Sequence, residues 1–90
     1  MRFALMTKDK PGALQTRMDN RDAHLAYIAE TGVVEMAGPV LDDDGQMCGS
    51  LIILEVADLA AAQAWAANDP YAKAGLFSDV TLRAWKKVIG

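Results

Sequence analysis

The chain has 90 residues, of which 52% are hydrophobic and only 7% aromatic, and its formal net charge at pH 7 is −3. The acidic balance and the lack of a basic run argue against a nucleic-acid-binding surface, and the lone Cys48 excludes an intramolecular disulfide. No apolar stretch reaches the roughly 20 residues that a membrane-spanning helix needs, and the first apolar run is too short for a signal peptide, so we expect one cytoplasmic domain over residues 1–90.

The first third of the chain predicts a strand and a long helix. Phe3–Met6 is short and apolar and is followed by a polar loop. A helix is predicted from Ala13 to Thr31, with Gly32 as its left-handed terminator and Arg21 in its apolar stripe. The apolar residues that recur at helical spacing, and that we expect to face the core, are Leu14, Met18, Leu25 and Ile28.

The middle of the chain predicts two strands and a second helix. Val33–Ala37 has the composition of a strand, which Gly38-Pro39 is expected to close, and Asp-Gly in the following polar run predicts a hairpin-like reversal. The aliphatic run Ser50–Val56 predicts a central strand. Asp58 is expected to cap a helix over residues 59–67, whose alanines have high helix propensity.

The last part of the chain completes an α+β fold. Asp69 is expected to cap a short helical turn with Pro70 at its first position, and the alternation in Asp79–Val88 predicts a fourth strand. With right-handed crossovers, the order strand, helix, strand, strand, helix, strand gives a four-stranded antiparallel sheet with both helices on one face. The other face keeps apolar side chains such as Trp85, which predicts a homodimer that packs sheet on sheet.

The one histidine of the chain, His24, is the first candidate for chemistry, and Asp69 is its candidate partner. A carboxylate that meets an imidazole can hold it in one tautomer and create a proton-transfer pair. Two structural interpretations stand beside this one: His24 as a half-buried residue bonded to a backbone carbonyl, and Asp69 as a helix cap only. One histidine and one cysteine cannot supply the usual ligands of a zinc site in one subunit, so we expect no metal.

Five segments, spread over nearly the whole chain, form a set: Arg21–Leu25, Gly38-Pro39, Ala64–Tyr71, Ala74–Val80 and Trp85–Val88. In this order they resemble the YciI-like (YCII-related) family, and the Asp-Pro-Tyr followed by Ala-Gly is the most specific match. The resemblance implies a ferredoxin-like βαββαβ fold that dimerises as an α/β barrel. It also implies an active site in which a histidine and an aspartate map onto His24 and Asp69.

Residues and resemblance together predict a small cofactor-independent enzyme, a lyase or isomerase that acts on a small anion by proton transfer or elimination. Some members of the family are similar to enzymes that act in this way on aromatic or phenolic compounds. His24 would be general base and acid, and Asp69 would orient it. The candidates for substrate binding, several of which ordinary packing or a solvated helix flank would explain as well, are Arg17, Arg21, Tyr71, Gly38, Pro39 and Ser50.

A non-enzymatic role is the alternative. The same cleft would serve a sensor or accessory subunit that binds a small molecule without changing it, because a fold does not decide function. Haem binding through His24 is a third and weaker hypothesis. A metabolite that stays unchanged on the protein would favour the binding module over the enzyme.

Overall fold

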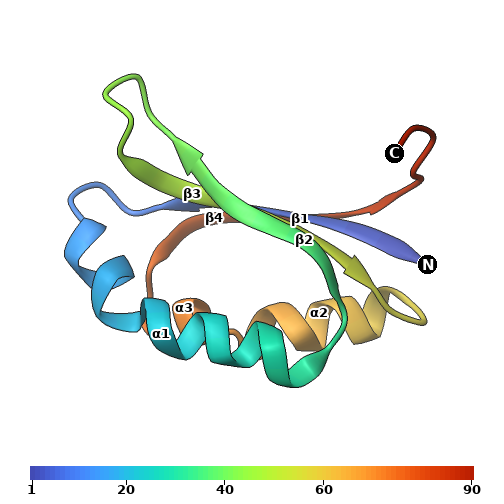
Figure 1. The fold of residues 1–90 in the computed structure, drawn as a ribbon. Helices are drawn as coiled ribbons and strands as arrows, with labels where there is room; N and C mark the ends of the chain where they lie inside the picture. Colours follow the sequence, from blue (N-terminus) through green and yellow to red (C-terminus); the bar gives the residue numbers. More distant parts are fainter.

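Four strands form one antiparallel sheet with the order β2-β3-β1-β4 in the computed structural model, which describes residues 1 to 90. The elements in chain order are β1 (Arg2–Asp9), α1 (Leu14–Thr31), β2 (Val34–Leu41), β3 (Met47–Glu55), α2 (Leu59–Asn68), α3 (Pro70–Lys73) and β4 (Phe77–Trp85). The helices cover one face of the sheet and leave the other open (Figure 1). The predicted ferredoxin-like α+β topology is therefore confirmed. None of the helices is both long and apolar enough to cross a lipid bilayer.

The apolar core lies between the two central strands and α2. Within the sheet, Leu5 of β1 is paired with Ile52 on one side and Leu82 on the other. Each large side chain that is fully buried in this layer contributes about 1.5–3 kcal/mol to folding relative to an exposed one. The buried core cluster consists of Phe3, Leu5, Ile52, Leu54, Ala62 and Trp65.

Two hydrogen bonds fasten the C-terminal end of α1 to α2. The indole N–H of Trp65 donates to Thr31 Oγ1 at 2.9 Å, and the Tyr27 hydroxyl donates to the carbonyl oxygen of Trp65 at 2.8 Å. Gly32 ends α1 with a φ of 65°, the left-handed terminator that the sequence predicts. The position of α1 over the sheet is set by this anchored end.

The predicted apolar stripe of α1 is not its buried face, and this expectation is wrong. Three members of the stripe are 37% to 49% exposed: Leu14, Met18 and Leu25. The buried residues of the helix are instead Arg17 and His24. The reason is that two buried carboxylates lie beneath α1, with Asp9 paired to Arg17 and Asp69 paired to His24. A polar side chain is tolerated inside a protein when it is hydrogen-bonded, so these pairings override the hydrophobic periodicity.

All four strands differ from the prediction in their boundaries, and β1 covers Arg2–Asp9 rather than Phe3–Met6. β2 runs on through Gly38-Pro39, which was expected to close it, because an edge strand pairs on one side only and so accommodates a proline. β3 begins at Met47 rather than at Ser50, and β4 covers 77–85 rather than 79–88. Gly49 permits the longer β3, since a Cβ atom at this position would collide with the carbonyl oxygen of Thr7.

The open face of the sheet is rich in apolar side chains. The strand register places Leu51 beside Met6 on one side and Gly38 on the other, so residues from three strands meet there. At the end of this face where Arg2 pairs with Trp85, the Glu35 carboxylate binds the Arg2 guanidinium at 2.7 Å. The large apolar residues of the face, each 40% to 53% exposed, are Met6, Met36, Val40, Leu51 and Trp85.

Candidate active site

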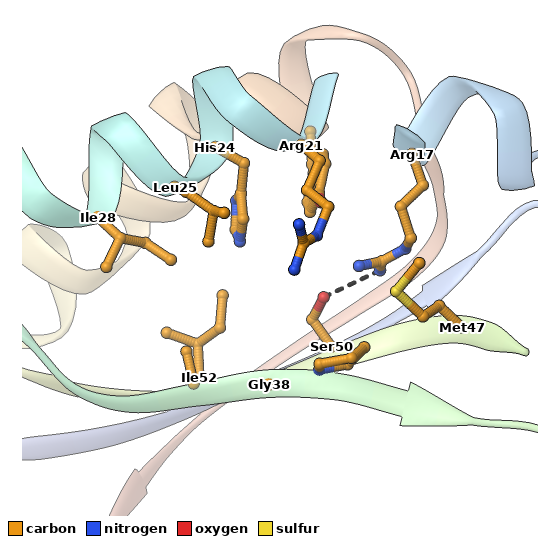
Figure 2. A pocket seen from close by; sticks show the side chains of 12 residues that line it. Arg17, Arg21, His24, Leu25, Ile28, Gly38, Met47, Ser50 and Ile52 are labelled. Atoms are coloured by element: carbon orange, nitrogen blue, oxygen red, sulfur yellow. Dashed lines mark hydrogen bonds between the residues drawn. The ribbon is translucent and has the colours of Figure 1, made fainter. Parts of the chain in front are cut away.

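A cavity of about 150 Å³ lies between α1 and the helix-covered face of the sheet. Side chains of α1 point into it from one side, and β2 and β3 form the opposite wall (Figure 2). Of the eight predicted site residues, seven line this cavity and Asp69 alone does not. The full lining consists of Arg17, Arg21, His24, Leu25, Ile28, Ala37, Gly38, Pro39, Met47, Ser50, Ile52 and Tyr71.

Asp69 lies behind His24 and is completely buried. It stands between α2 and α3, where its extended backbone makes it the N-cap of α3 with Pro70 at the next position. Its Oδ1 accepts the backbone N–H of Tyr71 at 3.0 Å and lies 2.8 Å from His24 Nδ1. Its Oδ2 is buried without a partner. The capping role and the contact with His24 therefore coexist on a single oxygen.

The contact with Asp69 fixes the orientation of the His24 ring. A carboxylate only accepts hydrogen bonds, so Nδ1 carries the proton, and in the neutral ring Nε2 is then the free acceptor. The ring is 6% exposed and stacks on Tyr71, with centroids 3.9 Å apart and planes 14° from parallel. An imidazole held in this way can take a proton from a molecule in the cavity through Nε2.

Arg17 forms a buried ion pair across the cavity wall. Its Nε and Nη2 donate to the two carboxylate oxygens of Asp9 at 2.7 and 3.0 Å, and Nη2 also donates to Ser50 Oγ at 2.9 Å (Figure 2). Its guanidinium carbon lies 4.7 Å from the centroid of the Tyr71 ring. Burial lowers the pKa of Arg17, but the hydrogen bond and the charge of Asp9 outweigh it and leave that pKa above its ordinary value.

Arg21 differs from Arg17 in that its side chain forms no ion pair within the chain. It is an exposed residue whose guanidinium points into the cavity between His24 and Arg17 (Figure 2). The charges of both arginines affect the pKa of the Tyr71 phenol. Burial raises the pKa of Tyr71 above its ordinary value, although the charges of Arg17 and Arg21 act to lower it.

The sheet side of the cavity is formed by a short stretch of β2 together with β3. Gly38 and Pro39 belong to this wall, and Ser50 stands directly opposite Pro39 in the strand register. Ser50 is 3% exposed, and its hydroxyl oxygen accepts from Arg17. Apolar side chains that the sequence did not indicate as site residues complete the lining: Leu25, Ile28, Ala37, Met47 and Ile52.

Asp9, the buried partner of Arg17, is the residue near the cavity that sequence reasoning missed. It lies between two lysines and just before a Pro-Gly turn, which is typical of a solvated loop. In the structure it is the last residue of β1 and only 8% exposed. The alternation of the strand could have indicated its burial. In β1 every second side chain points to the same face, and the series Phe3, Leu5 and Thr7 continues to Asp9.

The structure brings no three residues of the types histidine, cysteine, aspartate and glutamate together in a geometry that could hold a metal ion. The polar groups that line the cavity are the imidazole of His24, the guanidinium groups of Arg17 and Arg21 and the hydroxyl groups of Ser50 and Tyr71. Proton transfer and binding of an anion are what such a set can do.

Comparison with known proteins identifies relatives over the full length of the chain. Protein YciI of Escherichia coli O6:H1 is 37% identical over 97 residues, which cover 98% of this chain and 99% of that protein. An uncharacterized protein of Haemophilus influenzae is 34% identical over 97 residues, with the same coverage.

Solved structures extend the comparison. The 5-chloro-2-hydroxyhydroquinone dehydrochlorinase TftG of Burkholderia phenoliruptrix AC1100, in complex with 2,5-dihydroxybenzoquinone, is 39% identical with a TM-score of 0.87, and the match covers 96% of this chain and 94% of that one. An antibiotic biosynthesis monooxygenase has a TM-score of 0.61 at 14% identity and 98% coverage of both chains, a likeness that shows the fold alone.

The family model of the YCII-related domain matches residues 1–86 of the chain. The chain therefore belongs to the YCII-related domain family.

Proposed function

We propose that this protein is a cofactor-independent lyase that eliminates a leaving group from a small hydroxylated aromatic ring, with His24 as general base and acid. The observation that carries the proposal is the 2.8 Å contact between His24 Nδ1 and the buried Asp69 carboxylate, at the wall of a cavity. It is supported by the similarity to TftG, a dehydrochlorinase of a chlorinated hydroxyhydroquinone.

The size of the cavity suits one aromatic ring. Its volume is about 150 Å³. An apolar cavity of roughly this volume is known to bind benzene. Leu25, Ile28 and Ile52 offer apolar contacts for the ring. The polar groups of Arg21, His24 and Ser50 are spaced around it to meet ring oxygens.

The proposed reaction balances without an external oxidant. His24 Nε2 removes a proton from a ring hydroxyl, and a proton is returned to the ring carbon that bears the halogen. A second hydroxyl group on the ring then loses its proton, which expels the halide ion and leaves a quinone. The ring is oxidised by two electrons while a carbon–halogen bond is replaced by a carbon–hydrogen bond, so the net change is loss of one proton and one halide ion. An imidazole that alternates between base and acid serves all of these steps.

Asp69 would act on the reaction through His24. In the proposal its carboxylate keeps the proton on Nδ1, and it stabilises the imidazolium that forms when Nε2 accepts a proton. Tyr71 would hold the imidazole plane from its stacked position, 3.9 Å away between centroids. Ser50 and the backbone of Gly38-Pro39 would position the ring from the sheet side.

We also propose that two copies of the chain pack through the open sheet face. Five large apolar side chains on this face are 40% to 53% exposed in the single chain. Such a concentration of exposed apolar residues usually marks an interaction site. A self-complementary sheet face covered by a second copy would give the barrel-type homodimer that the family resemblance implies.

The proposal is tested with purified protein and 5-chloro-2-hydroxyhydroquinone in the absence of oxygen, by measuring chloride release and quinone absorbance. The unaltered protein should release one chloride per quinone formed. His24→Ala should lower kcat/KM by about 10²–10⁴-fold, the usual share of general acid–base catalysis. Lys86→Gln, a change of an exposed residue outside the cavity, is the matched control.

Two results would reject the proposal. Chloride release by His24→Ala at the rate of the unaltered protein would show that this imidazole is not the catalyst. Tight binding of the ring by the unaltered protein with no release of chloride would favour the binding module instead. Circular dichroism of each variant separates loss of chemistry from loss of fold.

A further inference from the structure

Two arginines from successive turns of α1 reach into the same cavity, and their electrostatic situations differ (Figure 2). The side chain of Arg17 is 3% exposed, and its guanidinium donates hydrogen bonds to both oxygens of the Asp9 carboxylate. The side chain of Asp9 is 5% exposed. A bidentate pair of this kind is electrically neutral as a unit. Arg21 has no carboxylate partner in the chain.

We infer that Arg21 is the residue that selects the ligand by charge: it binds an oxyanion of an aromatic ring, while the positive charge of Arg17 is balanced by the Asp9 carboxylate and selects nothing. This inference deepens the proposed function. What it says about the reaction rests on that proposal, whereas what it says about ligand binding does not. The cavity then takes the anion of a hydroxylated ring, with its charged oxygen at Arg21 and a second, protonated oxygen at His24.

The charges around the cavity support this assignment. Arg17 and Asp9 cancel, and the contact of His24 with Asp69 occupies the other buried carboxylate. The guanidinium of Arg21 is therefore the positive charge that remains free to meet a ligand. A guanidinium is well matched to an oxyanion because its N–H groups form a planar fork.

The test uses a matched pair of ring-sized probes, benzoate and its neutral counterpart benzamide, titrated into the full chain and followed by NMR. The unaltered protein should bind benzoate about 10- to 100-fold more tightly than benzamide, as expected for a charge-assisted hydrogen bond. Arg21→Gln should abolish this preference and change the affinity for benzamide less than about twofold. Lys86→Gln removes an exposed positive charge outside the cavity and should leave the preference intact.

A double variant isolates the role of Arg17. Asp9→Leu with Arg17→Met replaces the buried ion pair by apolar side chains, a change that proteins often tolerate. This variant should keep the preference for benzoate. Loss of the preference in a folded double variant, or its survival in Arg21→Gln, would overturn the inference, as would equal binding of both probes by the unaltered protein. Preference through Arg21 without any chloride release would leave the inference standing and reject the proposed reaction.

Discussion

His24 and Tyr71 share one carboxylate oxygen, since Asp69 Oδ1 lies 2.8 Å from the imidazole Nδ1 and 3.0 Å from the Tyr71 backbone nitrogen. The same two residues stack their rings. One short segment, the start of α3, therefore fixes both the direction and the plane of the imidazole. A substitution at residue 69 tests this arrangement most directly.

Asp69→Asn should separate charge from geometry. An asparagine side-chain oxygen still accepts both N–H groups, and asparagine is as good an N-cap as aspartate, so α3 should form. The negative charge that stabilises a protonated His24 is lost, and kcat should fall by about 10²–10⁴-fold. Steady-state kinetics combined with thermal unfolding checks this. An unchanged kcat, with the fold intact, would remove Asp69 from the mechanism.

The buried Arg17–Asp9 pair makes a prediction about stability. Asp9→Ala leaves a guanidinium that is 3% exposed without its carboxylate, which should cost about 3–5 kcal/mol of unfolding free energy. The double change of Asp9→Leu and Arg17→Met should cost far less, because it leaves no unpaired charge. Urea denaturation of the two variants side by side measures the difference. Equal destabilisation of both would mean that packing, and not charge, sets the cost.

Glu35 makes a prediction about pH. The hydrogen bond from Arg2, with further help from the charges of Arg2 and Lys87, holds the pKa of Glu35 below its ordinary value. Between the lowered pKa and the ordinary one, the unfolded chain binds more protons than the folded chain, so stability rises with pH across this window. The contribution of Glu35 should be complete above its ordinary pKa and disappear as the pH falls through the lowered value.

Comparison with Glu35→Gln isolates that contribution. The difference in unfolding free energy between the unaltered chain and this variant should be constant near neutral pH and shrink as the solution is acidified. Glu30→Gln, which removes one negative charge from an exposed position on α1, is the control. A Glu35 difference that grows on acidification would contradict the assignment.

The open sheet face makes a prediction about assembly. Leu51→Arg places a charge in the centre of the proposed contact and should convert a dimer into a monomer. Leu59→Arg on α2 is a matched control, because Leu59 is 47% exposed and Leu51 43%, and it should leave the dimer intact. Light scattering coupled to size-exclusion chromatography gives both masses. A monomeric unaltered chain, or a dimeric Leu51→Arg variant, would exclude association through this face.

The topology could be predicted from the sequence because local signals agree with one another. Gly32 ends α1, Asp58 caps α2 by accepting the Ala61 N–H at 2.8 Å, and Pro70 opens α3, as their residue types indicate. Such signals act over a few residues and need no knowledge of the tertiary structure. The nearness of residues 24 and 69 was a hypothesis that only the folded chain could test.

The orientation of α1 could not be predicted for a physical reason. Periodicity places Leu14 and Met18 in the core, but burial of a helix face depends on what lies opposite it. Opposite α1 lie the carboxylates Asp9 and Asp69, one from the end of a strand and one from a helix cap. A pairing between distant segments leaves no mark on the spacing within one helix.

This inversion of α1 has a consequence for how the protein can change. Replacing a buried ion pair by apolar residues often leaves a protein equally stable or more stable, and the inward positions 17 and 24 are where such replacements would act. Selection for heat resistance alone would therefore tend to erase the ionisable groups of the helix. Their retention in a thermostabilised descendant would be a sign that a ligand, rather than the fold, requires them.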